Sequence, residues 1–206
     1  MHSHKNETVI IGIQGDEGSA NESACLEFMR HRNLPNAEIR YLISTRNVLR
    51  ELERGHITLG IFAYKTRRGG LVEETGEALR IYSCQVVDTL ELEIHHAIFC
   101  GEGFNENGVP RIVSHPQALK DHRRFLMRRF KNAVFETEAD TALAARKLKQ
   151  GLYEPNTLVI APKNCREIYD LPLYLDNLPS NSGYITTFYL VRRPGERAVS
   201  EKRTQI

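Results

Sequence analysis

Apolar and polar positions alternate along the first half of the chain with two different periods. Short runs rich in β-branched residues, typical of buried strands, are followed by segments with the three- or four-residue apolar spacing of amphipathic helices. The predicted strands are residues 9–14, 39–44 and 57–64, and the predicted helices are 21–31, 46–55, with Thr45 as its N-cap, and 72–82. This βαβαβα order predicts a parallel or mixed sheet covered by helices.

A second α/β unit follows after an interruption. From residue 86 to residue 99 the chain runs extended for far longer than a typical strand, which suits a crossover between two lobes. The alternation then resumes, with strands predicted at 111–114, 133–136, 157–161, 173–175 and 185–191 and helices at 116–130, 141–150 and 163–169. We therefore expect an α/β protein with two lobes and a central cleft. Lobe 1 comprises residues 1–94, completed by part of 183–206, and lobe 2 comprises residues 95–182.

Composition places the chain among ordinary globular proteins. Of its 206 residues, 41% are hydrophobic and 26% are charged, without a long Gly, Ser or Pro tract, which excludes a disordered or fibrous chain. The formal net charge of +2 gives no electrostatic argument for a nucleic-acid or membrane partner. No run of about 18 apolar residues and no export signal is visible, so we expect a cytoplasmic protein.

The sequence contains no pattern typical of a metal or redox centre. The cysteines are far apart and form no C-x-x-C. Buried, reduced thiols are therefore expected at Cys25, Cys84, Cys100 and Cys165. His95 and His96 are neighbours on a predicted strand and point to opposite faces, so they cannot jointly bind one ion. We predict no metal site.

Two strand-to-helix turns carry signals for binding an anion. In Gly15-Asp-Glu-Gly-Ser-Ala-Asn21, glycines let the backbone approach a ligand, and Ser19 stands at a helix start, where free amides and the helix dipole favour negative charge. In Ser114-His-Pro-Gln117, Pro116 fits the first helical position, and the Ser hydroxyl and Gln amide could hold a carboxylate or hydroxyl. Each turn could equally be a plain helix cap without a ligand.

Three further groups are candidates on weaker signals. Thr141 follows Asp140 at a helix start, where capping alone would explain both residues. Thr186 and Thr187 point to opposite faces of their strand, so only one of them can face a given cleft. The last group is a glycine-flanked basic loop of Lys65, Arg67 and Arg68. This loop could bind a carboxylate or form a solvated surface.

Taken in order, these segments resemble the catalytic domain of prephenate dehydratase over roughly residues 8–193. The family's G-P-E-G-T/S-F-S turn is similar to residues 15–21, its G-S-V-x-E-T stretch to Gly70-Leu-Val-Glu-Glu-Thr75, and its S-H-P-Q-A-L motif to Ser114-His-Pro-Gln-Ala-Leu119. The helix start S-T-A-x-A-A resembles residues 140–145, and A-x-x-x-x-A-x-x-Y-G-L resembles residues 161–171. Five ordered matches are more specific than any one of them.

Two of the family's signatures are altered. I-E-N-S falls on Tyr64-Lys-Thr-Arg67, so the family's Asn is absent and Thr66 is its substitute. T-R-F is Thr186-Thr-Phe188 here, which keeps the family's catalytic threonine and loses its arginine. Both changes fall at the expected cleft.

The resemblance implies a lyase that converts prephenate to phenylpyruvate in phenylalanine biosynthesis, without a metal or cofactor. It also implies a fold similar to the type II periplasmic binding proteins and a homodimer or higher homo-oligomer, and we expect no regulatory ACT domain after residue 206. It assigns catalysis to Thr186. The substrate-binding residues that it implies are Glu17, Gly18, Ser19, Thr66, Arg67, Ser114, His115, Gln117, Thr141 and Phe188.

Two other functions stay open at this point. Related prephenate decarboxylases remove carbon dioxide but keep the ring hydroxyl, giving a dihydro-4-hydroxyphenylpyruvate for secondary metabolism. Bilobed folds of this kind also make binding proteins, here a cytosolic protein for a small carboxylate. The retained Thr186 favours dehydration, so this is the activity we expect.

Overall fold

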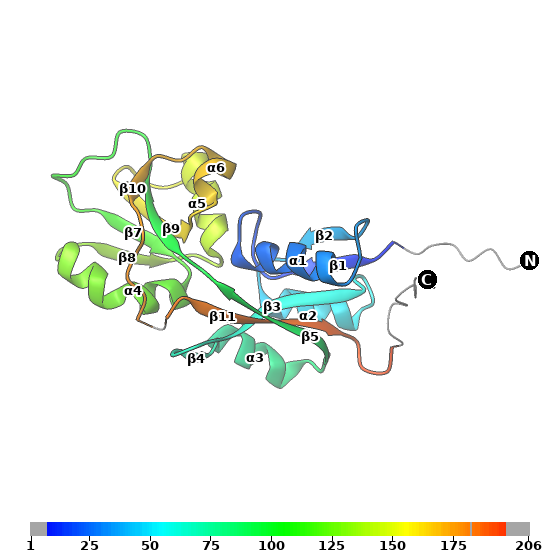
Figure 1. The fold of residues 1–206 in the computed structure, drawn as a ribbon. Coiled ribbons are helices and arrows are strands. Elements are labelled where there is room, and N and C mark those ends of the chain that lie inside the picture. Colours follow the sequence, from blue (N-terminus) through cyan, green and yellow to red (C-terminus); the bar gives the residue numbers. More distant parts are fainter. Residues whose placement is uncertain (1–7, 182, 197–206) are drawn as a thin grey trace, which may run out of the picture.

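The computed structural model describes residues 8–181 and 183–196 and contains two mixed sheets (Figure 1). Sheet A is built from β1 (Ile10–Ile13), β2 (Glu38–Tyr41), β3 (Leu59–Thr66), β4 (Gly70–Leu71), β5 (Gln85–Glu93) and β11 (Ile185–Arg192). Its order is β2-β1-β3-β11-β5, and β4 pairs with β3. Sheet B is built from β6 (His96–Cys100), β7 (Arg111–Ser114), β8 (Val134–Thr137), β9 (Thr157–Pro162) and β10 (Leu173–Leu175), in the order β10-β6-β9-β7-β8. The predicted α/β class is confirmed.

Six helices occur in the described residues. Sheet A is packed by α1 (Ala20–His31), α2 (Thr45–Glu53) and α3 (Glu73–Ile81), and sheet B by α4 (Pro116–Arg129) and α5 (Thr141–Lys149), with the short α6 (Cys165–Tyr169) against α5. Ser44 caps α2 by accepting a hydrogen bond from the Asn47 amide. The prediction that Thr45 is the N-cap is therefore wrong, because Thr45 is the first residue of the helix. Helix α6 begins two residues later than predicted and ends at Asp170 in the left-handed conformation.

The chain passes between the sheets twice. The predicted extended stretch 86–99 is two strands, β5 in sheet A and β6 in sheet B, separated at Ile94 and His95. Strand β11 then brings the chain back and lies antiparallel between β3 and β5. The lobes remain a proposal, with residues 1–94 and part of 183–206 in lobe 1 and residues 95–182 in lobe 2. The strands β1–β5 and β11 lie in sheet A, and β6–β10 lie in sheet B.

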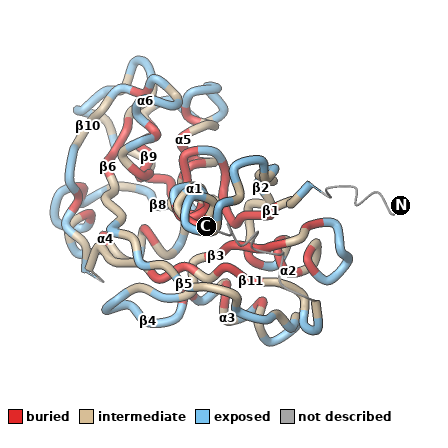
Figure 2. The backbone as a smooth tube through the Cα atoms, turned by 45° about the vertical axis from the view of Figure 1, so that its right-hand side comes forward, coloured by how far each residue is buried: buried red, intermediate tan, exposed pale blue. Residues whose placement is uncertain are grey.

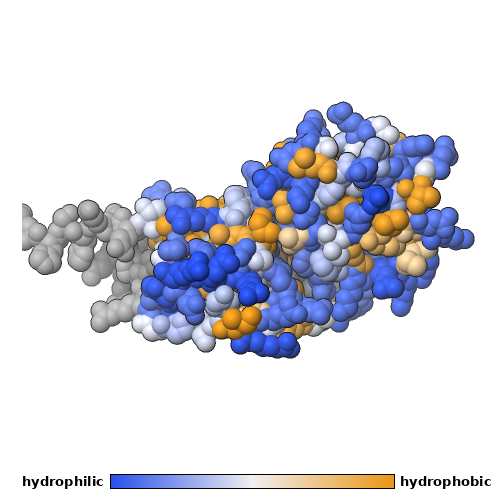
Figure 3. Space-filling model, turned by 180° about the vertical axis from the view of Figure 1, so that it is seen from behind, coloured by the Kyte–Doolittle hydropathy of each residue, from blue (hydrophilic) through white to orange (hydrophobic). Residues whose placement is uncertain are grey.

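Each sheet has apolar cores on its two faces (Figure 2). Clusters around Phe28 and around Phe62 cover sheet A, and clusters around Phe99 and around Leu126 cover sheet B. All six residues of β9 are buried, as expected for a strand with helices over both faces. The face drawn in Figure 3 shows hydrophobic side chains in separate small groups among hydrophilic ones. The predicted homo-oligomer stays a prediction.

No helix in the described ranges is long and apolar enough to cross a membrane.

Candidate active site

A cavity of about 120 Å³ lies where the two sheets meet. It is lined from sheet A and its connections by residues that include Gln14, Asn21, Thr66, Thr186 and Phe188, and from the other lobe by residues that include His96, His115, Gln117, Asp121 and Thr141. Since one buried water needs only about 10–15 Å³, the cavity has room for several water molecules or for part of a small ligand. None of the described lining residues is Lys or Arg.

Three helices begin at this cavity. Ala20 and Asn21 are the first residues of α1, Gln117 and Ala118 follow Pro116 in α4, and Thr141 opens α5. The first amides of a helix have no acceptor within the helix, and the helix dipole adds positive potential there. Three such ends around one small volume favour a ligand with negative charge.

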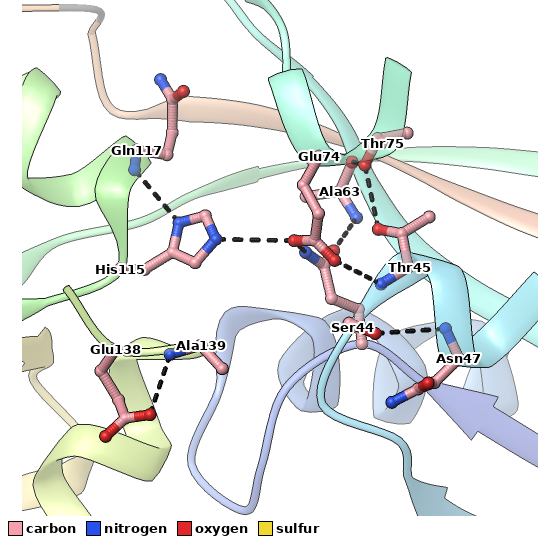
Figure 4. A network of polar contacts seen from close by, with 11 residues as sticks. Ser44, Thr45, Asn47, Ala63, Glu74, Thr75, His115, Gln117, Glu138 and Ala139 are labelled. Carbon is pink, nitrogen blue, oxygen red and sulfur yellow. Dashed lines mark hydrogen bonds and ion pairs between the residues drawn. The ribbon is translucent and has the colours of Figure 1, made fainter. Parts of the chain in front are cut away.

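His115 reaches across to the other lobe (Figure 4). Its Nδ1 accepts a hydrogen bond from the Gln117 amide at 3.1 Å, so the proton lies on Nε2, which is 3.5 Å from Glu74 Oε2. Glu74 also accepts hydrogen bonds from Gln14 Nε2 at 2.8 Å and from the Thr45 amide at 2.7 Å. These contacts fix the Glu74 carboxylate and orient the ring of His115, which lines the cavity, before any ligand enters.

The two threonines of β11 have different surroundings. Thr186 lines the cavity, as does Phe188 two residues later. Thr187 is buried and donates a hydrogen bond to Glu91 Oε1 at 3.2 Å. Thr66, which pairs with Thr186 in the sheet, also lines the cavity, and its hydroxyl accepts from the Gly69 amide.

Several predicted residues of the first turn are not lining residues of this cavity. The Gly18 amide donates to Glu22 Oε2 at 2.7 Å, and Ser19 caps α1 by accepting from the Glu22 amide. Glu17 is exposed, and its carbonyl accepts a hydrogen bond from Tyr169 Oη at 2.6 Å. The contact of Glu17 with Tyr169 joins the turn to the second lobe, whereas Gly18 and Ser19 are bonded to Glu22 in α1, so the Gly18 amide is not free for a ligand.

Ser114 and Arg67 also lie away from the cavity. Ser114 is fully buried and donates a hydrogen bond to the Ile160 carbonyl at 2.7 Å, which joins β7 to β9. Arg67 is exposed, like its basic neighbours Lys65 and Arg68, and none of the three lines the cavity. The cationic contact expected from this loop is therefore absent from the described lining.

Sequence reasoning missed part of the lining. Asn21 is buried and lines the cavity, and its Oδ1 has no hydrogen-bond partner among the described residues. Asp140 is also buried there, and burial raises the pKa of its carboxyl to about 6 although it accepts amides from Asp16 and Leu143. His96 and Asp121 complete this set. The one signal in the sequence was position, since Asn21 and Asp140 fall in motifs already singled out.

No group of three His, Cys, Asp or Glu residues in the described part of the chain is arranged to hold a metal ion. The four cysteines are free, with Cys25 and Cys165 buried and the other two half-buried.

A second cavity, of about 740 Å³, lies within the second lobe beside Cys100, Tyr153 and Leu171. None of the predicted site residues lines it.

The family model described as prephenate dehydratase matches residues 11–196. The chain belongs to the prephenate dehydratase family. A bifunctional chorismate mutase/prephenate dehydratase of Stutzerimonas stutzeri is 23% identical over 196 residues, which is 95% of this chain and 52% of that protein. Arogenate dehydratase 5 of Arabidopsis thaliana is 23% identical over 186 residues, 90% of this chain and 42% of that protein. The chain thus spans about half the length of the curated relatives that it matches.

Solved structures show the same fold. A prephenate dehydratase from Arthrobacter aurescens, in complex with L-Phe, superposes with a TM-score of 0.69 at 19% identity, covering 91% of this chain and 61% of that one. A periplasmic substrate-binding protein of an ABC transporter from Coxiella burnetii gives 0.54 at 12% identity, covering 91% and 85%. The predicted likeness to periplasmic binding proteins is confirmed at the level of the fold.

Proposed function

We propose that this member of the prephenate dehydratase family converts prephenate to phenylpyruvate. The observation that carries the proposal is the convergence of three helix N-termini on one small cavity without a lining Lys or Arg among the described residues. Prephenate is a dianion, and amide groups with helix dipoles can hold two carboxylates without a cation.

The substrate carboxylates would lie against the starts of α1, α4 and α5. The available groups are the first amides of α1 and the side chains of Gln117 and Thr141, all at the cavity. Hydrogen bonds to a carboxylate are stronger than those between neutral groups. They would also orient the leaving carboxylate relative to the ring, which is the positioning that this reaction needs.

Thr186 is the proposed donor to the departing hydroxyl. The ring becomes aromatic when carbon dioxide and the hydroxyl leave. The electron pair of the bond to the leaving carboxylate passes into the ring, and the hydroxyl leaves with the electron pair of its own C–O bond. The hydroxyl then needs a hydrogen bond or proton as its charge develops. Thr186 is the threonine that lines the cavity, whereas the hydroxyl of Thr187 is directed to Glu91.

The test is an assay of the purified protein with prephenate in deuterated water, reading phenylpyruvate by its alkaline absorbance and other products by mass. Dehydration gives phenylpyruvate with no solvent deuterium on a ring carbon. A ring-deuterated dihydro-4-hydroxyphenylpyruvate would instead identify a decarboxylase. Absence of turnover together with tight binding would identify a binding protein.

The matched pair Thr186→Val and Thr187→Val tests the role of the donor. Thr186→Val is expected to lower kcat by about a hundredfold, as for other lost donors to developing charge, with a smaller change in KM. Thr187→Val removes a hydroxyl of the same size from the opposite face and should leave kcat nearly unchanged. Equal kcat values for the two variants would contradict the assignment.

One observation favours arogenate as a second candidate substrate. Arogenate carries an ammonium group where prephenate has a keto group, and Asn21, which lines the cavity at the start of α1, has a side-chain amide oxygen, the kind of acceptor that an ammonium donor needs. Comparison of kcat/KM for the two compounds, in the native protein and in Asn21→Ala, distinguishes them. A preference for arogenate that disappears in Asn21→Ala would support this candidate.

A further inference from the structure

Two histidines at the cavity form a hydrogen-bonded pair that the proposed reaction has not used. His96 begins β6 and lines the cavity, and His122 lies behind it in α4, where it is 1% exposed. His96 Nδ1 is 3.0 Å from His122 Nε2, and the rings meet edge-on. A hydrogen bond between two imidazoles requires one donor and one acceptor, so the protonation of the pair can be worked out.

The inner ring sets the direction of this hydrogen bond. His122 Nδ1 is 2.9 Å from the carbonyl oxygen of Pro179, and a carbonyl oxygen only accepts, so Nδ1 carries the proton. Burial lowers the pKa of His122, which keeps the ring neutral. Asp121 Oδ2, at 3.9 Å from His122 Nε2, is too distant to form a hydrogen bond. The Nε2 atom of His122 is therefore an acceptor.

The outer ring must then be the donor. His96 carries its proton on Nδ1, and this N–H donates a hydrogen bond to His122 Nε2. Burial, followed by the neighbouring His122, lowers the pKa of His96 to about 3, so the ring has a single proton. The other ring nitrogen, Nε2, is left with a lone pair on the edge that is not used by His122.

This lone pair is available to a ligand. The adjacent His95 has a different environment, with its ring 4.5 Å from that of Tyr184 and its Nε2 3.1 Å from Glu93. His96 itself is a lining residue of the cavity. A bare lone pair repels a carboxylate and attracts a hydrogen-bond donor. At neutral pH both carboxylates of prephenate are ionised and its keto oxygen only accepts, so its ring hydroxyl is its one donor.

We propose that His96 is a specificity-determining residue whose Nε2 accepts a hydrogen bond from the ring hydroxyl of the substrate; the proposal rests on the proposed function. His122 is the positioning residue, because its hydrogen bond to Pro179 selects the tautomer of His96. The contact directs the hydroxyl end of the substrate to the start of β6. The two carboxylates of the substrate can then bind at the N-termini of the helices that begin at the cavity. The hydroxyl oxygen keeps its own lone pairs for the Thr186 donor.

The tautomer is tested without a substrate, by ¹⁵N NMR of the imidazole nitrogens in the native protein. His96 is expected to show a protonated Nδ1 and an unprotonated Nε2 throughout pH 5 to 8, although His95, His115, His122 and Asp121 surround it. A proton on Nε2, or a His96 that titrates in this range, would overturn the proposal.

The hydroxyl contact is tested with His96→Asn and two ligands. The Asn amide can still donate to His122, but the acceptor at Nε2 is lost. Prephenate affinity is expected to fall about tenfold, while the affinity for phenylpyruvate, which has no ring hydroxyl, stays within about twofold. His95→Asn is the matched control and should change neither. Thermal melting of each variant shows that it is folded.

The outcomes separate the two proposals. Equal losses for prephenate and phenylpyruvate in His96→Asn would mean a structural role only and would overturn the contact while leaving the proposed function intact. A native protein that does not bind prephenate would overturn the proposed function and the hydroxyl contact together. In that case the NMR result alone would still decide the tautomer.

Discussion

The two strand-to-helix turns that the sequence singles out as anion sites use their polar groups in different ways. Residues 15–21 and residues 114–117 both combine a serine with a helix start, and both suggest an anion site. In the first turn, the Gly18 amide and the Ser19 hydroxyl are both bonded to Glu22. In the second turn, the serine is bonded to Ile160, but Gln117 lines the cavity and His115 lines it too.

The difference comes from what each turn touches. The first turn lies against the second lobe, through Asp16 with Arg146 at 2.7 Å and Glu17 with Tyr169 at 2.6 Å. The polar groups of Asp16, Gly18 and Ser19 therefore have protein partners already. Past Ser19, the turn offers the cavity only Ala20 and Asn21. The second turn offers the side chains of His115 and Gln117. We therefore expect side-chain substitutions to affect substrate binding more in the second turn, and substitutions between Asp16 and Ser19 to affect mainly stability.

The largest effect is expected from Gln117→Leu. The substitution keeps the size of the side chain but removes an amide that we assign to a substrate carboxylate. A hydrogen bond to a charged group contributes about 1.5–3 kcal/mol, so kcat/KM should fall by about ten- to a hundredfold. The measurement is steady-state kinetics with prephenate. A kcat/KM within twofold of the native value would mean that the Gln117 side chain does not bind the substrate, and the proposed difference between the two turns would be wrong.

Asp140→Asn should change the pH dependence of stability, because Asp140 connects the first turn to α5. Its folded-state pKa is raised from 3.8 to about 6, so the folded protein holds the proton more tightly than the unfolded chain. Asp140 therefore lowers stability as pH rises from about 4 to about 6, and the loss persists above that range. Urea unfolding should show that the Asn variant gains on the order of 2 kcal/mol relative to the native protein between pH 4 and pH 7.5. A constant difference between the two proteins would contradict the raised pKa.

Ser19→Ala and Ser114→Ala form a pair, one from each turn. Each removes a buried hydroxyl with a protein partner, so each should lower the free energy of unfolding by about 1 kcal/mol. Neither should change the KM for prephenate by more than about twofold. Denaturant unfolding and kinetics on the same samples test this. A large increase in KM for either variant would indicate that the serine contacts the substrate.

The smallest effect is expected from replacing Lys65, Arg67 and Arg68 together by alanine. These exposed side chains do not line the cavity, so they can attract an anionic substrate only over a distance. KM should rise less than about threefold at 0.15 M salt and somewhat more at low salt, because salt screens exposed charges. A large change that is insensitive to salt would indicate direct contact.

The local pattern of the chain was sufficient for the class of fold and for most of its elements. Strand β7 and the helix that follows it begin at the predicted residues, because a β-branched run ends at Ser114 and Pro116 fits only a first helical turn. Alternation along β11 also separated Thr186 from Thr187, since neighbouring strand residues face opposite sides. The family signatures pointed to the same segments.

Only the tertiary structure decided which polar groups are free. Periodicity indicates that Ser114 lies at a strand end, but not that Ile160 on another strand accepts its hydroxyl. The role of His96 depends on His122 and on the carbonyl of Pro179, which lie far away in sequence. Hydrogen bonds of this kind join distant parts of the chain, whereas a sequence pattern reports only on neighbours. The sequence by itself therefore determined the elements and the family, and the packing of the two sheets and their helices determined which side chains line the cavity.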